Sequence, residues 1–198
     1  YPASDWYDIC YGTGVVQEYN ASVSGGSDKM DYMIGLGYMN QKGVMENNDD
    51  AKRYSWNIKI NSQVTKRLRV GASILGNFRF NTEPIYGVGT TINIINRALP
   101  IFGTQLPDGR WLNTWLSTPG RNNPENPLMC LHEGKTTRQP HRLLGKIDLQ
   151  YKLPWNLTYK ASFGYQKCDN YSKNFKHAMY TYNPKTYERK DFSAYVYV

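Results

Sequence analysis

Side chains suited to catalysis or metal binding are sparse and scattered in this sequence. The three histidines, His132, His141 and His177, have no partner four residues away and no cysteine or carboxylate at the spacing of a metal site. Nucleophile-elbow, phosphate-loop and paired-carboxylate motifs are absent from the sequence. We therefore expect no enzymatic activity, no metal site and no cofactor.

The cysteines, Cys10, Cys130 and Cys168, are odd in number and contain no CxxC pair. This spacing indicates neither a disulfide framework nor a zinc site. A bridge between Cys130 and Cys168 would be feasible in an oxidising compartment. The pattern favours three unpaired thiols, and whether Cys130 and Cys168 pair stays open at this point.

The segment from 81 to 141 holds most of the ten prolines and shows no sustained period, which predicts a long loop. Three aromatic residues are concentrated there: Phe102, Trp111 and Trp115. Aromatic faces stack on sugars and grip peptide side chains, so we predict that these three rings contact a solute. An equally weighted alternative is that they pack the loop onto its own scaffold.

Elsewhere the chain alternates apolar and polar side chains, which is the period of a β-strand. In the strand around Leu36 every second residue is apolar or aromatic: Tyr32, Ile34, Leu36 and Tyr38. Similar patterns begin at residues 19, 54, 68, 143 and 157, and together they predict six strands. Several exceed the roughly 5 to 6 residues usual in soluble sheets and approach the about 9 to 11 that cross a bilayer.

The connections between these strands alternate in length. They are short at 25 to 29, 63 to 66 and 154 to 156, and long at 41 to 53, 81 to 141 and from 167 onward. Membrane barrels have short turns on one side and long external loops on the other. The fold class that we predict is therefore all-β, an antiparallel transmembrane β-barrel segment of about six to seven meandering strands with long external loops.

Alternation also divides the strand residues between two faces. The predicted lipid-facing residues are Ile34, Leu36, Tyr38, Trp56, Ile58, Ile60, Val70, Ile74, Ile147, Leu149, Tyr159 and Phe163. The predicted lumen-facing basic residues are Lys59, Arg69, Arg79, Lys146 and Lys160. An outer aromatic girdle is expected from Tyr19, Tyr38, Tyr54, Phe78 and Tyr165, and an inner one from Tyr32, Tyr151 and Trp155.

Bulk properties exclude some classes of protein. A mean hydropathy of -0.65 leaves no run able to cross a bilayer as a helix. The net charge of +8 comes from scattered basic residues without a nucleic-acid motif, so we expect no nucleic-acid partner. Six strands cannot close a barrel with a solute-sized lumen, so the chain is expected to be one part of a larger barrel.

A competing interpretation is a water-soluble all-β carbohydrate-binding module that uses its exposed aromatic residues. In such a module the apolar faces would pack against a second sheet instead of lipid. The two hypotheses differ in where the side chains of Ile34, Trp56 and Ile58 point.

Three stretches near the start of the chain are distinctive: Asp5-Trp6 through Gly12-Thr13-Gly14, Glu18 through Gly26, and Leu36 through Gly43. Together they resemble the barrel start of SusC/RagA-type TonB-linked transporters of Bacteroidetes. Arg53-Tyr54 and Leu68-Arg69-Val70-Gly71 support this resemblance, and Asn126-Pro127-Leu128 with the strand pair to Gly164-Tyr165 is similar to the family's later loop and hairpin. The similarity covers nearly the whole chain, and residues 167 to 198 are its least distinctive part.

This resemblance implies an importer of glycans or peptides in the outer membrane of a Gram-negative, Bacteroidetes-like cell. It implies a SusD-like surface lipoprotein, TonB acting through a plug, outer-membrane lipid and an oligosaccharide or peptide solute as partners. Residues 1–198 would be a partial barrel domain without the plug. They would divide into the end of an external loop (1–14), four strands (15–80), a long external loop (81–141), a hairpin (142–166), and an external loop with the start of a further strand (167–198). The lumen-facing basic residues would guide an anionic solute or contact the plug.

Overall fold

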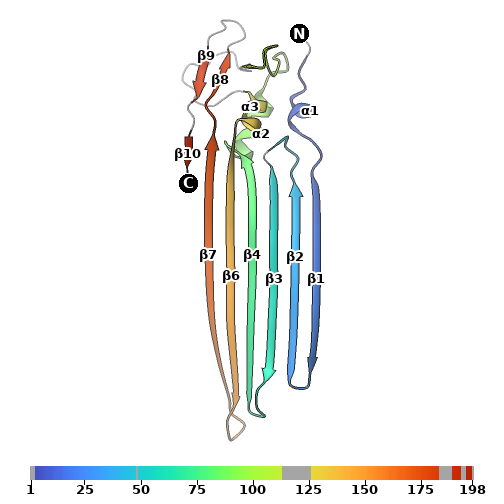
Figure 1. Cartoon of the computed structure of the whole chain (residues 1–198), viewed down its shortest axis with the longest axis vertical. Coiled ribbons are helices and arrows are strands. Elements are labelled where there is room, and N and C mark those ends of the chain that lie inside the picture. The colour runs from blue at the N-terminus through green and yellow to red at the C-terminus, as the bar shows by residue number, and fades with distance from the viewer. Residues whose placement is uncertain (1–2, 48, 113–125, 183–188, 193–194, 198) are drawn as a thin grey trace.

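One antiparallel sheet dominates the computed structural model, which describes residues 3–47, 49–112, 126–182, 189–192 and 195–197. Its strand order is β1-β2-β3-β4-β6-β7-β10 (Figure 1). The strands are β1 (Val15–Ser27), β2 (Met30–Lys42), β3 (Asp50–Gln63), β4 (Leu68–Pro84), β6 (Gly134–Lys152), β7 (Thr158–Lys176) and β10 (Tyr195–Tyr197). Successive strands of this sheet are neighbours in space, so the predicted antiparallel meander is confirmed.

The remaining elements gather at one end of the sheet (Figure 1). They are the helices α1 (Trp6–Cys10), α2 (Val88–Arg97) and α3 (Pro127–His132) and the short strands β5 (Trp111–Leu112), β8 (Met179–Tyr182) and β9 (Arg189–Phe192). The three short strands form a small second sheet in which β5 runs parallel to β8. Among the described residues, none of the helices has the length and apolar character needed to cross a membrane.

Short turns occupy the opposite end of the sheet from the helices, as the alternation of connection lengths predicted (Figure 1). They join β1 to β2, β3 to β4 and β6 to β7. In the last of these turns Trp155 and Asn156 adopt φ angles of 61° and 59°. Two consecutive left-handed residues reverse an antiparallel pair tightly, and an aromatic residue rarely adopts this conformation.

The strands run further than the sequence predicted. The predicted loop from 81 to 141 shrinks to 85–133, the predicted hairpin from 142 to 166 extends to 134–176, and the connection predicted at 41–53 covers only 43–49. The physical reason is that both faces become polar beyond the apolar band, so alternation fades while backbone pairing continues. The segments predicted as plain loops at 1–14 and 81–141 also contain α1, α2 and α3.

A compact apolar core lies among the helices and not on the sheet. Trp6, Cys10, Met45, Ile95 and Leu131 form one buried cluster. We call α1, α2, α3 and the connection 43–49, which supply these residues, the helical cap. The Trp6 indole Nε1 donates to the Leu99 carbonyl at 3.1 Å, so chain segments more than ninety residues apart are joined there.

Local sequence explains why α1 and α3 begin where they do. The Asp5 carboxylate accepts from the amides of Tyr7 and Asp8, and the Asn126 side chain accepts from the Met129 amide at 3.1 Å. Both are N-caps, and Pro127 follows in the first turn, where a missing amide hydrogen costs nothing. The buried Asn126 amide also donates to the carbonyls of Thr104 and Leu112, each at 2.7 Å, which fixes the cap's longest connection to α3.

None of the three cysteines forms a disulfide, so the bridge between Cys130 and Cys168 that the sequence left open is not present. Cys10 and Cys130 are buried in the helical cap, whereas Cys168 is exposed on β7. Burial, reinforced by the nearby Glu46 carboxylate, raises the pKa of the Cys10 thiol to about 12. Burial likewise raises the pKa of the Cys130 thiol.

Thiol labelling of the folded protein will therefore be selective. At about pH 8 a maleimide is expected to modify Cys168 and to spare Cys10 and Cys130, because their thiols are inaccessible and almost entirely protonated. Peptide mass spectrometry measures the labelled fraction at each position. All three cysteines should react once the protein is unfolded in guanidinium. Rapid labelling of Cys10 before unfolding would contradict a closed cap.

Replacing Trp6 by alanine is expected to open the helical cap. The substitution leaves a large cavity and removes the hydrogen bond to Leu99, at a cost of about 3 to 5 kcal/mol. Hydrogen exchange of residues 85 to 112 in the full-length protein should accelerate. The control is Tyr7→Phe, because Tyr7 is 58% exposed and loses only its hydroxyl bond to Asn96. Equal exchange in both variants would show that Trp6 does not hold the cap.

Candidate functional site

The strand register separates the two predicted sets of side chains. Residues paired directly across an antiparallel ladder point to the same face of a sheet. One such row runs Val23, Ile34, Ile58 and Ile74 across β1 to β4. Following the register through β6 and β7 places every residue of the predicted lipid-facing set on this side, which we call the apolar face. Lys59, Arg69, Arg79, Lys146 and Lys160 lie on the other side, the polar face.

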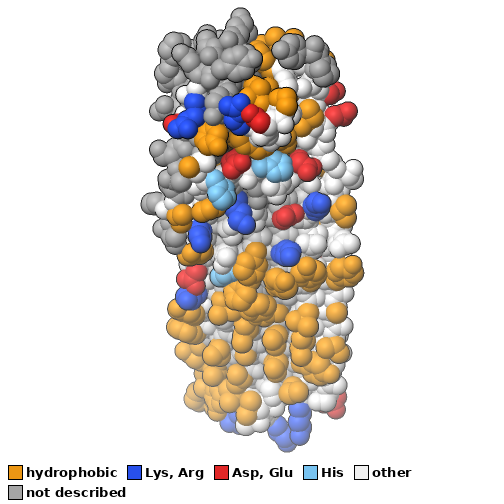
Figure 2. Space-filling view, turned by 45° about the horizontal axis from the view of Figure 1, so that its top comes forward, with side chains coloured by type: hydrophobic (Ala, Val, Ile, Leu, Met, Phe, Trp, Pro, Cys, Tyr) orange, Lys and Arg blue, Asp and Glu red, His pale blue; other side chains and the backbone are white. Residues whose placement is uncertain are grey.

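No described part of the chain covers the apolar face. Figure 2 shows its hydrophobic side chains as a band across the strands, with charged side chains above the band and a few at the lower end. Leu36, Ile147 and Phe163 are 58%, 54% and 70% exposed. No second sheet packs on this band within the described residues, and the buried clusters lie in and beside the helical cap. The soluble-module interpretation requires such a second layer, so the geometry does not support it.

Aromatic rings mark the edge of the band nearest the helical cap. Tyr19, Tyr38 and Tyr54 are register partners, with ring centroids 6.4 Å and 5.1 Å apart. Phe78 and His141 continue this row with centroids 4.6 Å apart. Interfacial positions favour such amphipathic rings. The row contains Tyr19, Tyr38, Tyr54 and Phe78 of the expected outer girdle, and their place at a membrane interface stays a prediction.

The edge of the apolar band does not run parallel to the rows of register partners. The row that starts at Tyr19 on β1 reaches Asp169 on β7, whereas the last aromatic residue of the band on β7 is Tyr165, four positions earlier. A band that followed the hydrogen bonds would show no such offset. Strands tilted relative to the plane of an apolar layer produce it, because each neighbouring strand crosses that plane at a different residue.

A small residue lets one large ring lie flat on this face. A side chain at Gly76 would collide with the indole of Trp56, which covers it from the neighbouring strand. The Trp56 ring also meets the ring of Phe78 edge-on, with centroids 4.7 Å apart.

The polar face carries ion pairs between neighbouring side chains. Each of its carboxylates on β1 to β7 pairs with a basic side chain of the same face: Glu18 with Arg53 at 3.0 Å, Asp31 with Arg69 at 3.2 Å, Glu83 with Arg138 at 3.7 Å, and Asp148 with Lys146 at 2.7 Å. These groups are partly exposed, so each pair adds little stability. Their effect is to neutralise the acidic residues, which leaves the face with surplus positive charge.

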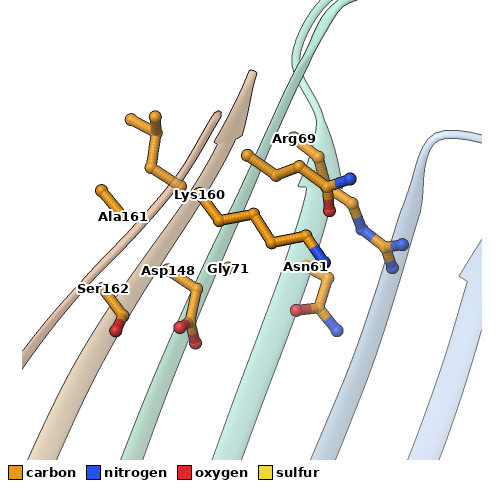
Figure 3. Close-up of a pocket in the computed structure, with 9 residues that line it drawn as sticks. Asn61, Arg69, Gly71, Asp148, Lys160, Ala161 and Ser162 are labelled. Carbon is orange, nitrogen blue, oxygen red and sulfur yellow. The ribbon is translucent and has the colours of Figure 1, made fainter. Parts of the chain in front are cut away.

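A hollow of about 380 Å³ lies on the polar face toward the short turns. Figure 3 shows Lys160 of β7 extending across the sheet toward Asn61 of β3, with Arg69 and Asp148 beside them. The Asn61 amide donates to Asp31 at 2.5 Å, and Asp31 also accepts from Arg69. This hollow is an open polar surface suited to hydrated solutes or to a polar protein segment.

Residues predicted to contact a solute have different environments. Phe102 is only 8% exposed, so the packing alternative accounts for its ring. Trp111 is partly buried; its Nε1 donates to the Glu133 carboxylate at 3.0 Å, and its ring stacks on His132. Trp115 lies outside the described residues. Solute contact by Trp111 and Trp115 stays a prediction.

Three polar-face arginines were missing from the predicted set: Arg53, Arg138 and Arg142. Arg138 and Arg142 share the even parity of Lys146 on β6, so extending the alternation backward would have found them. Pro140 and His141 interrupt the pattern at that point. Within the described part of the chain, no cluster of three or more His, Cys, Asp or Glu side chains could hold a metal ion.

The chain is similar in sequence to known TonB-dependent receptors. No family model matches the chain. It is 25% identical over 181 residues to TonB-dependent receptor P3 of Formosa agariphila, covering 87% of this chain and 18% of that protein. It is 24% identical over 187 residues to TonB-dependent receptor SusC of Bacteroides thetaiotaomicron, covering 81% of this chain and 18% of SusC.

Solved structures agree with the sequence matches at the level of fold. The RagAB peptide importer in its closed-closed state has a TM-score of 0.68 and 20% identity, and the match covers 88% of this chain and 20% of the importer chain. A second RagAB peptide transporter structure has a TM-score of 0.66 and 19% identity over 96% of this chain. The chain thus spans about a fifth of the length of the proteins that it matches. In sequence and in fold, it resembles the SusC/RagA-type TonB-linked transporters.

Proposed function

We propose that this chain is a segment of the barrel of an outer-membrane TonB-dependent importer. The apolar face contacts lipid and the polar face lines the lumen. The observation that carries this proposal is the single-layer sheet with an uncovered apolar band on one face and paired ions on the other. Water would penalise that band heavily, whereas lipid covers it at no cost.

The dimensions of the band support this orientation. On β6 the band runs from Leu143 to Tyr151. This length is about 27 Å along the strand at ~3.4 Å per residue, and at a tilt of roughly 40° it spans about 20 Å of the membrane thickness, comparable with the roughly 25 Å apolar belt of outer-membrane barrels. Within the apolar band, unbroken ladders satisfy the backbone groups of the inner strands, which hydrocarbon requires. The outer edge of β1, and the part of the β7 edge that β10 leaves unpaired, would pair with strands from other parts of the parent chain.

The long connections and the helical cap would lie outside the cell, and the short turns would lie in the periplasm. Residues 1–198 would then be one part of a single barrel domain, in which a plug from elsewhere in the parent chain contacts the hollow of the polar face near the short turns. TonB would act through that plug. A SusD-like surface lipoprotein would cover the cap, and the solute would contact Trp111 and Trp115.

The solute would be an oligosaccharide or a peptide. A polar, ionised lumen suits hydrophilic solutes of both kinds, and the named relatives include a peptide importer.

Charge inserted into the apolar face tests the lipid contact. Ile58→Lys in the full-length protein is expected to impair barrel assembly by about 2 to 4 kcal/mol, because Ile58 lies in the middle of the band. The yield of heat-modifiable, protease-resistant barrel in outer-membrane fractions measures assembly. The matched control is Asn57→Lys on the opposite face of the same strand, which should assemble normally. Equal yields from both variants would contradict the assignment of the faces.

Import itself can be tested in cells that express the full-length gene. We expect uptake of labelled oligosaccharides or short peptides that disappears when the gene or tonB is deleted. Complementation with the intact gene should restore uptake. Uptake that persists without TonB would remove the energy coupling from the proposal, and a complete lack of uptake of both solute classes would contradict import.

A further inference from the structure

The upper part of the polar face holds a second hollow of about 440 Å³ near the level of the aromatic row. Arg79 of β4 and Arg142 of β6 line it, together with Asn77 and Asn170. Arg142 is the register partner of Asn77, which precedes the girdle residue Phe78. In the proposed orientation, a solute that enters from the long-connection side meets this hollow before the lower one.

Pro140 marks the position of the hollow. Pairing between β4 and β6 is continuous to Phe78 and His141, then stops, and resumes at Asn81 and Arg138. Proline has no amide hydrogen for the ladder, so an interruption at Pro140 is expected. The interruption lies beside Arg79, and Pro140 itself lines the hollow.

The charges around the hollow are unbalanced. Arg53, the register partner of Arg79, is paired with Glu18, and Arg138 is paired with Glu83. Within the described residues, Arg79 and Arg142 have no carboxylate partner. Arg142 contacts the Cys168 thiol. Asp169 also lines the hollow, but its carboxylate pairs with Lys167 at 2.9 Å.

We infer that Arg79 and Arg142 form a binding site for the carboxylate or sulfate groups of an anionic solute on the import path. This inference rests on the proposed transport function and specifies its solute class. Guanidinium groups bind planar or tetrahedral oxyanions through paired N–H donors. Neither Arg79 nor Arg142 has a carboxylate partner within the described residues. The amides of Asn77 and Asn170 supply neutral partners for adjacent hydroxyl or peptide groups.

Binding to the purified full-length protein tests the site with defined probes. Trigalacturonate and triaspartate provide carboxylates from a sugar and from a peptide, and maltotriose is the neutral probe. In isothermal titration calorimetry, the double variant Arg79→Gln/Arg142→Gln is expected to weaken binding of at least one anionic probe by about tenfold or more. Its affinity for maltotriose should not change. Wild-type affinity for that anionic probe should fall as NaCl rises from about 0.05 to 0.5 M.

The matched control is Lys52→Gln. Lys52 precedes Arg53 on β3 and points to the opposite face of the sheet. The substitution therefore removes one positive charge at the same height without changing a residue that lines the hollow. Arg79→Lys/Arg142→Lys keeps the charge but loses the paired donors, and it should bind the anionic probe with intermediate affinity. Heat-modifiable mobility verifies that each variant is a folded barrel.

The outcomes separate this inference from the transport proposal. Anion affinity that is the same in wild type and in Arg79→Gln/Arg142→Gln would overturn the site, as would a wild-type protein that binds neither anionic probe. Import in cells could persist in both cases, so the transport proposal would stand. Which anionic probe binds more tightly identifies the source of the oxyanion group.

Discussion

The structure depends on one constraint: a single layer of β-sheet has a broad apolar face that no other described part of the chain covers. Within the described chain, the residues that usually form a core, such as Leu36, Ile58 and Phe163, lie on an open surface. The apolar contribution to the stability of this sheet must therefore come from another apolar phase or from further strands. Backbone pairing between neighbouring strands gives the sheet its shape, and its surroundings decide whether that shape is stable.

The two faces meet different requirements with the same strands. On the apolar face, packing depends on ring contacts and on a small residue, as where Trp56 covers Gly76. On the polar face, carboxylates are neutralised one by one, so the surplus charge remains on arginine and lysine. The helical cap is a third environment, where burial of Trp6, Cys10 and Leu131 resembles the core of a soluble protein. The cap joins distant chain segments without covering the band.

Alternation of side chains predicted the strands, their antiparallel order and the division between faces, because a period of two follows directly from strand geometry. The same reasoning did not predict the strand ends at 81–84, 134–142 and 167–176, where both faces are mostly polar. It also missed the helices of the cap. Their segments are short, so their caps at Asp5 and Asn126 are weak signals without the tertiary contacts that stabilise them.

By itself, the sequence determined which residues share a face, the short turns that reverse the chain, and the resemblance to a transporter family. Each of these is a local property, carried by residues within a few positions of one another. Only the tertiary structure decided that Phe102 is buried, that Trp6 reaches Leu99, and that Arg79 and Arg142 lie beside one hollow. These contacts join residues separated by about sixty to ninety positions, and strand register and cap packing set them, so no local pattern specifies them.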